Sequence, residues 1–175
     1  MPRVEKNAEV TLVVLVYRSL RWLDWCIDGV DSSKQETRYR WLVVANDATE
    51  EIRNDPRVDV DFRNADPSEF YINRVYRAWN EGFSLAPTQL VVNLSNDMYG
   101  SDHWLDELMA AKHKDPKTIP CALLVESGRI PSAMPEYVKN FGFHPGEFKA
   151  GSFREYAASL RQPGELEPGR LFGPT

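Results

Sequence analysis

Three short runs of polar residues follow apolar stretches of this 175-residue chain. The runs are Tyr17-Arg18, Asn46-Asp47 and Ser95-Asn96-Asp97. Open α/β sheets bind ligands just beyond the carboxyl ends of their strands, so polar groups placed there can contact a bound molecule. Each run alone is more typical of a turn, because Asn and Asp side chains hydrogen-bond to nearby backbone. Their joint placement after successive apolar stretches favours a binding site.

The apolar stretches are short, which predicts strands, and Val10–Val16 and Trp41–Ala45 are typical of the buried strands of a parallel sheet. One further stretch, Val58–Phe62, alternates apolar and polar side chains and predicts a half-exposed strand. The predicted strands are Val10–Val16, Trp41–Ala45, Val58–Phe62, Leu90–Leu94 and Cys121–Val125.

Between the predicted strands, apolar residues recur at helical spacing. The first such stripe consists of Leu23, Cys26, Ile27 and Val30. Their i, i+3, i+4, i+7 spacing places them on one side of a helix. Similar stripes run from Ile72 to Phe83 and from Trp104 to Met109. Strands that alternate with helices predict an α/β fold, with a mostly parallel sheet flanked by helices.

The chain changes in character after Asp115, where most of its prolines and glycines lie. We expect Ser127–Pro168 to be mainly loop, with one short helix at Phe153–Leu160. A loop of that length in a compact domain is usually functional, for example as a lid, or else disordered. The length of the chain fits a single domain. We expect its core over residues 8–126 and an irregular Pro/Gly-rich region over residues 127–175.

Composition restricts the class of protein. A net charge of −5 argues against a nucleic-acid partner, because duplex binding needs a clustered basic surface. Cys26 and Cys121 each lie in an apolar stretch, which favours buried free thiols in a reducing compartment. The first nine residues are polar, and the apolar run after them is too short for a signal peptide or a membrane span. We expect a soluble, cytoplasmic protein without a membrane segment.

Four segments form an ordered series along the chain: Val10–Tyr17, Val43–Thr49, Arg77–Gly82, and Val91–Asp97 followed by Trp104-Leu105. In order and spacing they resemble glycosyltransferase family 2, whose members have the Rossmann-like GT-A fold. The first resembles that family's first strand, and the second its Val-Val-Asp-Asp-Gly-Ser segment. The third resembles the Ala-Arg-Asn-x-Gly helix segment. The last resembles the strand that carries the DXD motif, together with the Pro-x-Trp-Leu segment that follows it. The resemblance extends from about Val10 to Leu108.

The resemblance implies a nucleotide site formed by Val16, Tyr17, Asn46, Asp47 and Asn96. Asp47 matches a residue that accepts the ring N–H of a pyrimidine base. A fixed carboxylate suits uracil or thymine, whose N3 is a donor, and repels the acceptor N3 of cytosine. Tyr17 matches an aromatic residue that can stack on the base. The resemblance therefore favours a UDP-sugar as the donor.

The resemblance also implies a metal site at Asp97, which matches the last acidic residue of DXD. Mn²⁺ or Mg²⁺ there would bridge diphosphate oxygens and neutralise the departing charge. Ser95 and Asn96 occupy the other motif positions, so we expect a weaker metal site that forms with the nucleotide bound. Asp97 is also a candidate turn or helix-capping residue. Asp102 can cap the following helix instead, which leaves Asp97 for the metal.

Other positions depart from the family pattern. Leu15 stands where the family usually has Pro, Arg18 where it has Asn, and Trp79 where it has Arg. Arg74 and Arg77 lie near the region in which family members place a basic residue facing the diphosphate. On a helix they point to different sides, and we expect both to be solvated charges.

Inverting members of this family use a carboxylate base, often in a Glu-Asp pair, to deprotonate the acceptor hydroxyl. Gly169–Thr175 resembles the start of the strand that precedes this pair, and no such pair follows it in the chain. We therefore expect the chain to be truncated relative to the family. The alternative is a base from elsewhere in the chain, such as Glu147 or Glu155 in the Pro/Gly-rich region, with Glu126 just before that region as a further candidate.

These features predict an inverting glycosyltransferase of hexosyltransferase type. It would transfer a sugar from a nucleotide-sugar donor to a glycan or other hydroxyl acceptor that the sequence does not identify. One alternative is a non-catalytic module that binds a nucleotide or a glycan. Another is a nucleotidyltransferase-like domain, which shares the metal chemistry of DXD; a glycine-rich loop after the first strand would favour it, and Tyr17–Arg21 contains no glycine.

Overall fold

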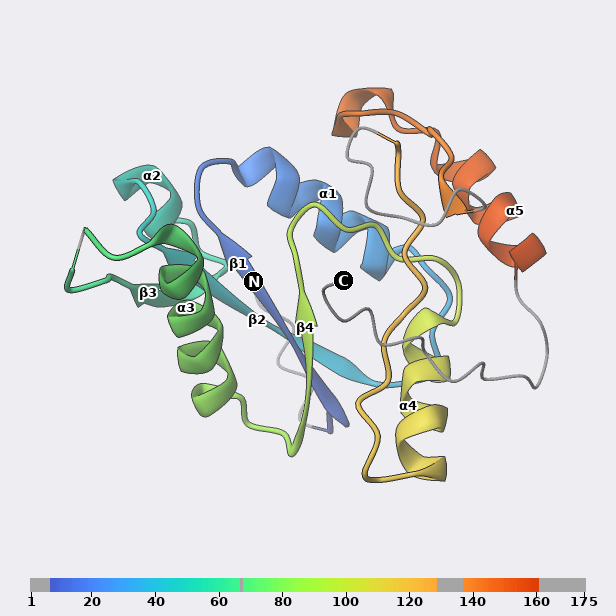
Figure 1. The fold of residues 1–175 in the computed structure, drawn as a ribbon, viewed down its shortest axis with the longest axis horizontal. Helices are drawn as coiled ribbons and strands as arrows, with labels where there is room; N and C mark the ends of the chain where they lie inside the picture. Colours follow the sequence, from blue (N-terminus) through green and yellow to red (C-terminus); the bar gives the residue numbers. More distant parts are fainter. Residues whose placement is uncertain (1–6, 67, 129–136, 161–175) are drawn as a thin grey trace, which may run out of the picture. The chain divides into compact units, whose positions relative to one another are not determined.

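The computed structural model describes residues 7–66, 68–128 and 137–160, which fall into two compact units. The described part of the larger unit consists of residues 7–32, 36–66 and 68–100, and that of the smaller unit consists of the rest. The larger unit contains β1 (Val10–Val16), α1 (Leu20–Asp31), β2 (Tyr39–Asn46), α2 (Glu50–Arg53), β3 (Val58–Phe62), α3 (Tyr71–Leu85) and β4 (Leu90–Leu94) (Figure 1). The smaller unit contains α4 (Trp104–Lys114), the 3-10 helix η2 (Pro145–Glu147) and α5 (Ala150–Leu160).

The four strands of the larger unit form one sheet in the order β3-β2-β1-β4, and all neighbouring pairs are parallel. β1 pairs with β2 from Val10↔Tyr39 to Val16↔Ala45, and with β4 as far as Val14↔Leu94. The carboxyl ends of the strands therefore lie at the same edge of the sheet. The predicted α/β fold with a parallel sheet is confirmed.

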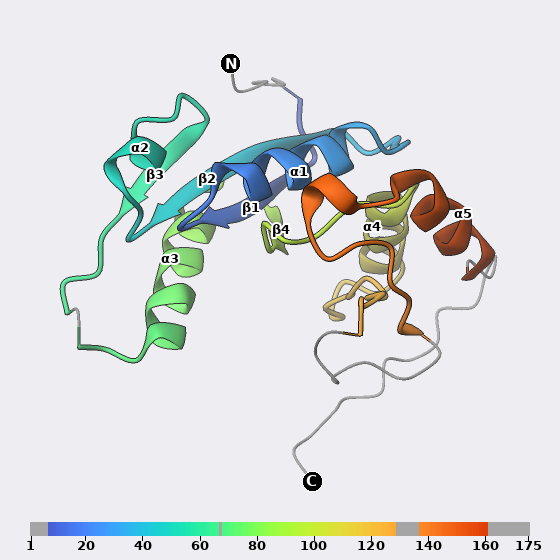
Figure 2. The same cartoon turned by 90° about the horizontal axis from the view of Figure 1, so that it is seen from above.

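β1 is one of the two inner strands of the sheet, and six of its seven residues are buried. Successive side chains of a strand point to opposite faces. Val14 accordingly packs in a core with Leu23 and Cys26 of α1, whereas Val13 packs in a second core with Ala78 of α3. Figure 2 shows α1 and α3 on opposite faces of the sheet. This double burial explains why β1 is apolar except for Thr11.

α3 approaches the sheet closely at Gly82. A Cβ atom at this position would lie 2.6 Å from Val13 Cγ1 and 3.0 Å from Val44 Cγ2. Glycine in a helix costs about 1 kcal/mol relative to alanine. At Gly82 that cost is offset by close packing of α3 on β1 and β2.

β3 contains a bulge. The register passes from Val43↔Val58 to Val44↔Val60, so Asp59 is an extra residue in β3. Its Oδ2 accepts a hydrogen bond of 2.8 Å from the backbone N–H of Val43. Simple alternation places Val58 and Val60 on one face, but Val58 packs against the α1-side core and Val60 against the α3-side core.

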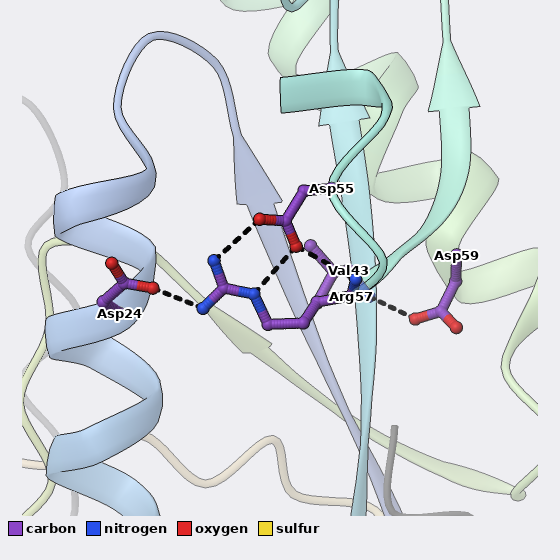
Figure 3. A network of polar contacts seen from close by, with 5 residues as sticks. All are labelled: Asp24, Val43, Asp55, Arg57 and Asp59. Carbon is purple, nitrogen blue, oxygen red and sulfur yellow. Dashed lines mark hydrogen bonds and ion pairs between the residues drawn. The ribbon is translucent and has the colours of Figure 1, made fainter. Parts of the chain in front are cut away.

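A polar network connects α1 to the start of β3 (Figure 3). The Arg57 guanidinium donates to both carboxylate oxygens of Asp55, at 2.8 and 2.9 Å, and also contacts Asp24 of α1. The hydrogen bond from Arg57 lowers the pKa of Asp55 below its ordinary value of 3.8. A carboxylate with a lowered pKa stabilises the fold above its ordinary pKa, and that contribution is lost as the pH falls through the folded value.

The predicted helices of the smaller unit are confirmed, with α5 starting three residues before the predicted Phe153. The predicted strand Cys121–Val125 is wrong. This segment forms no strand in the described part of the chain, and Leu123 and Leu124 are 55% and 45% exposed. Glu126 forms only an isolated parallel bridge with Val138. Apolar composition favours a strand but does not supply a partner for its backbone.

No helix in residues 7–66, 68–128 and 137–160 is long and apolar enough to cross a membrane.

The bulge generates a stability prediction. Replacing Asp59 by Ala leaves the N–H of Val43, a residue 1% exposed, without its acceptor. An unsatisfied buried donor costs about 1–3 kcal/mol, so we expect Asp59→Ala to lower the free energy of unfolding by that amount. Urea denaturation measures it. The matched control is Asp61→Ala on the same strand, which removes exposed ion pairs worth about 0–1 kcal/mol. Equal losses in the two variants would contradict the role of Asp59.

Candidate functional site

The strand order places a topological switch point between β1 and β4. From β1 the chain proceeds to β2 and β3 on one side, and α3 then returns it to β4 on the other side. In open α/β sheets, ligands bind in the crevice beyond the carboxyl ends of the strands at such a point. The residues that follow β1 and β4 are Tyr17 and Ser95, so two of the three polar runs flank the switch point. The third follows the neighbouring strand β2.

Tyr17 follows β1 directly and is 42% exposed. The guanidinium carbon of Arg18 lies 4.7 Å from the centre of its ring, and Arg18 donates a hydrogen bond of 3.1 Å to its hydroxyl. Val16 is fully buried in the core, so only its backbone is available to a ligand. α1 begins at Leu20, with Ser19 as its N-cap. The Ser19 side chain forms no cap hydrogen bond, and the first turn of α1 contains no acidic residue. The partial positive charge of this helix end is therefore not neutralised locally.

Asn46 is the last residue of β2 and is only 6% exposed. Its Oδ1 has no hydrogen-bond partner among the described residues. Buried polar atoms are nearly always hydrogen-bonded, and an orphaned one costs about 1–3 kcal/mol. The orphaned oxygen next to Asp47 marks a place where a donor from water or from a ligand would be stabilising.

Asp47 has a left-handed backbone, with φ of 46°, which Asp tolerates better than most residues. Its N–H donates to Phe62 O at 2.9 Å, and its Oδ1 accepts from the N–H of Asn64 at 2.8 Å. Its Oδ2 lies 3.5 Å from Nη1 of Arg74. The carboxylate thus fixes the segment after β3 and pairs with α3. Each carboxylate oxygen has two lone pairs, so acceptor capacity for a ligand remains.

Arg74 is not the solvated charge that the sequence predicts. Its side chain is 27% exposed, it pairs with Asp47, and its Nε is buried without a partner among the described residues. The sequence contains a signal that Arg74 faces the sheet. Arg74 precedes Ala78 by four residues and Gly82 by eight, and this spacing places all three on one side of the helix. The two small buried residues mark the side of α3 that faces the sheet. Arg77 is exposed as predicted, although its guanidinium forms an ion pair with both carboxylate oxygens of Glu69.

Asp97 is exposed and lies in the turn Ser95–Met98, which is closed by a 3.1 Å hydrogen bond from Met98 N–H to Ser95 O. No group of three His, Cys, Asp or Glu side chains in the described ranges could hold a metal ion. Asp97 fits a cation only as a single ligand, with diphosphate oxygens and water completing the shell. Mg²⁺ often binds proteins in that way. Asn96, the other central residue of the turn, is partly exposed.

The expected capping role of Asp102 is wrong. The N-cap of α4 is His103, with a left-handed φ of 62° and no cap hydrogen bond from its own side chain. The Gln35 side chain takes part of that role, because its Oε1 accepts a hydrogen bond of 3.1 Å from the N–H of Leu105 in the first turn. Asp102 instead accepts a hydrogen bond of 3.0 Å from the backbone N–H of Lys34.

The two cysteines differ in environment. Cys26 is a buried free thiol, as predicted, and its Sγ lies 3.6 Å from Ser95 O. Burial, and to a smaller extent the negative charge of Asp97, raises the pKa of Cys26 to about 12. The prediction that Cys121 is buried is wrong, because its segment does not join a sheet and the residue is exposed.

The candidate bases all lie in the smaller unit. Glu126 is at the isolated bridge, Glu147 ends η2, and Glu155 is on α5. The segment Gly169–Thr175, which resembles the start of the family's base strand, lies outside the described residues.

Comparison of this chain with known protein families and with curated proteins found no match. The interpretation of the site therefore depends on its own residues.

The cysteine environments predict two thiols of very different reactivity. At pH 8, a pKa of about 12 leaves on the order of 10⁻⁴ of Cys26 as the reactive thiolate. We expect an aromatic disulfide reagent to modify Cys121 within minutes and Cys26 only after unfolding. Cys121→Ser should abolish the fast phase, and Cys26→Ser should leave it unchanged. Rapid modification of both thiols in the folded chain would contradict the burial of Cys26.

Proposed function

We propose that this chain binds a uridine diphosphate sugar at the carboxyl edge of β1, β2 and β4, and that it is a glycosyltransferase of the family 2 type. The observation that supports this most is the switch point between β1 and β4, flanked by Tyr17 and by the Asp97 turn. The neighbouring end of β2 contributes Asp47. An exposed aromatic ring suits the face of the base, a partly buried acceptor suits its edge, and an exposed carboxylate suits a cation bound to the phosphates.

In this proposal the base lies near Asp47 and Arg74. The edge of uracil presents an N3–H donor between two carbonyl acceptors. A free lone pair of the Asp47 carboxylate accepts the N3–H, and the Arg74 guanidinium, 3.5 Å from that carboxylate, donates to a carbonyl. Cytosine presents an acceptor at N3 and an amino group, so the same pair of side chains disfavours it. Tyr17 offers its ring for stacking on the base.

The diphosphate lies between the Asp97 turn and the first turn of α1. The uncapped start of α1 favours negative charge, as does Arg18 nearby. A bound Mg²⁺ or Mn²⁺ would neutralise charge on the diphosphate as it leaves. Asp97 would supply one oxygen ligand, which makes metal binding and nucleotide binding interdependent.

In the transfer step an acceptor oxygen forms a bond to the anomeric carbon while the bond to the diphosphate oxygen breaks. The hydroxyl proton passes to a carboxylate base. Asp47 and Asp97 are both assigned to binding, so the base must come from elsewhere. A second candidate function is the binding of a nucleotide or glycan without transfer. It is supported because the residues assigned to the site bind a ligand and none of them removes the proton.

The metal role predicts that UDP binds more tightly with Mn²⁺ or Mg²⁺ than without. Asp97→Asn removes the charged ligand and should remove most of this gain while leaving metal-free UDP binding nearly unchanged. Isothermal calorimetry of both proteins, with and without metal, measures the four affinities. Asp28→Asn is the control, since it removes the same charge from an exposed position on α1. Equal UDP affinity with and without metal in the parent chain would exclude a metal role for Asp97.

The base site predicts selectivity for uracil over cytosine. UDP should bind the parent chain, CDP should bind poorly, and Asp47→Ala should weaken UDP binding by about 1.5–3 kcal/mol, the range for hydrogen bonds to charged groups. Asp47 also fixes Asn64, so unfolding must be followed in parallel to confirm that the variant is folded at the assay temperature. Arg74→Gln should also weaken UDP binding and leaves the bond between Asp47 and Asn64 in place. Similar affinities for CDP and UDP would remove both side chains from the base site.

A further inference from the structure

The segment Ser95–Tyr99, which carries Asp97, is attached to α1 at both ends. At its start, Cys26 Sγ lies 3.6 Å from Ser95 O. At its end, the ring of Tyr99 lies over Gly29, one helical turn after Cys26. All of these residues belong to the larger unit. The loop after β4 is therefore held by a defined side of α1.

The contact at the start lies under the turn. Cys26 is fully buried in the core between α1 and the sheet, so its position is fixed by packing. Ser95 O accepts both the thiol of Cys26 and the N–H of Met98, at 3.1 Å. The oxygen that closes the turn is thus the one that the helix holds. A thiol is a weak donor, so this hydrogen bond contributes little energy by itself. The contact nevertheless restrains the turn, because the packing of α1 fixes the position of Cys26.

The contact at the end depends on the absence of a side chain. A Cβ atom at position 29 would lie 2.5 Å from Tyr99 Cδ2 and 2.8 Å from its Cγ and Cε2. The same ring packs against Trp25, with centroids 5.1 Å apart. Glycine costs a helix about 1 kcal/mol, so Gly29 is tolerated where only glycine admits the ring.

We propose that Cys26 and Gly29 are positioning residues, which act through the turn rather than on a ligand. They hold both ends of Ser95–Tyr99, so the exposed Asp97 carboxylate between them is presented in one orientation. This inference rests on the proposed function, in which Asp97 contacts a cation bound with a nucleoside diphosphate. A single carboxylate ligand on a four-residue turn gains affinity from such preorganisation, because less order must be imposed on binding.

The test uses Gly29→Ala, with Cys26→Ala as a second variant should the first not fold. Hydrogen exchange at the amide of Met98 reports the turn directly. Calorimetry gives the affinity for UDP with and without Mn²⁺, and NMR titration gives the affinity for uridine, which lacks the diphosphate. Ile52→Val is the control, because it removes a methyl group from the same core without touching the turn.

We expect both positioning variants to exchange Met98 N–H faster than the parent. Loss of partners that orient a ligand residue typically costs 10–100-fold in metal affinity, so the Mn²⁺-dependent gain in UDP affinity should fall by about that factor. Uridine affinity should stay unchanged, and Ile52→Val should retain the full gain. If Cys26 and Gly29 had a merely structural role, the variants would lower the affinities for UDP and for uridine together, or would lower neither.

Two results would overturn the inference, and they are distinguishable. A parent chain that binds UDP with a Mn²⁺ gain that both variants retain would refute the positioning role alone, as would unchanged exchange at Met98. A parent chain that binds no UDP in any condition would refute the proposed function itself, and the positioning role with it.

Discussion

The burial of β1 on both faces is the constraint from which the rest of the larger unit follows. A strand without a polar face must be covered by α1 on one side and by α3 on the other, and it must have a strand neighbour at each edge. The chain satisfies this by adding β2 and β3 on one side of β1 first and β4 on the other side last. The switch point beside β1 is the consequence. Tyr17, Asp47 and Asp97 lie beyond the carboxyl ends of β1, β2 and β4.

The sequence predicted the elements of the sheet well because strands buried on both faces leave a simple apolar signal. Val10–Val16, which is buried on both faces, has the predicted bounds. Leu90–Leu94 also has the predicted bounds, although its residues are alternately half-buried and exposed. The bulge at Asp59 could not be predicted, since the sequence of Val58–Phe62 alternates regularly and only the pairing with β2 shows that Asp59 is an extra residue. Cys121–Val125 shows the opposite failure. Its composition is that of a strand, yet pairing depends on a partner that no local pattern specifies.

The candidate site was predicted in part, because turn residues at strand ends are visible in a sequence but their contacts are not. The sequence identified Asp47 and Asp97. It did not show that Asp47 already holds Asn64 and Arg74, or that the Oδ1 of Asn46 is buried without a partner. The sequence predicts Arg74 as a solvated charge because a charged residue on a helix usually is one; in the structure it lies on the side of α3 that carries the small buried residues Ala78 and Gly82. Long-range pairs of this kind appear only when the elements are packed.

The central claim is that a nucleotide diphosphate binds at the carboxyl edge of β1, β2 and β4. The most direct measurement is a ¹H–¹⁵N NMR titration of the chain with UDP and Mg²⁺, which locates the bound molecule without assuming any activity. The account predicts the largest shifts at the backbone amides of Tyr17, Asp47 and Asp97, with a weaker response at Asp97 when Mg²⁺ is left out. Shifts confined to the smaller unit, or no shifts at any UDP concentration up to millimolar, would contradict it.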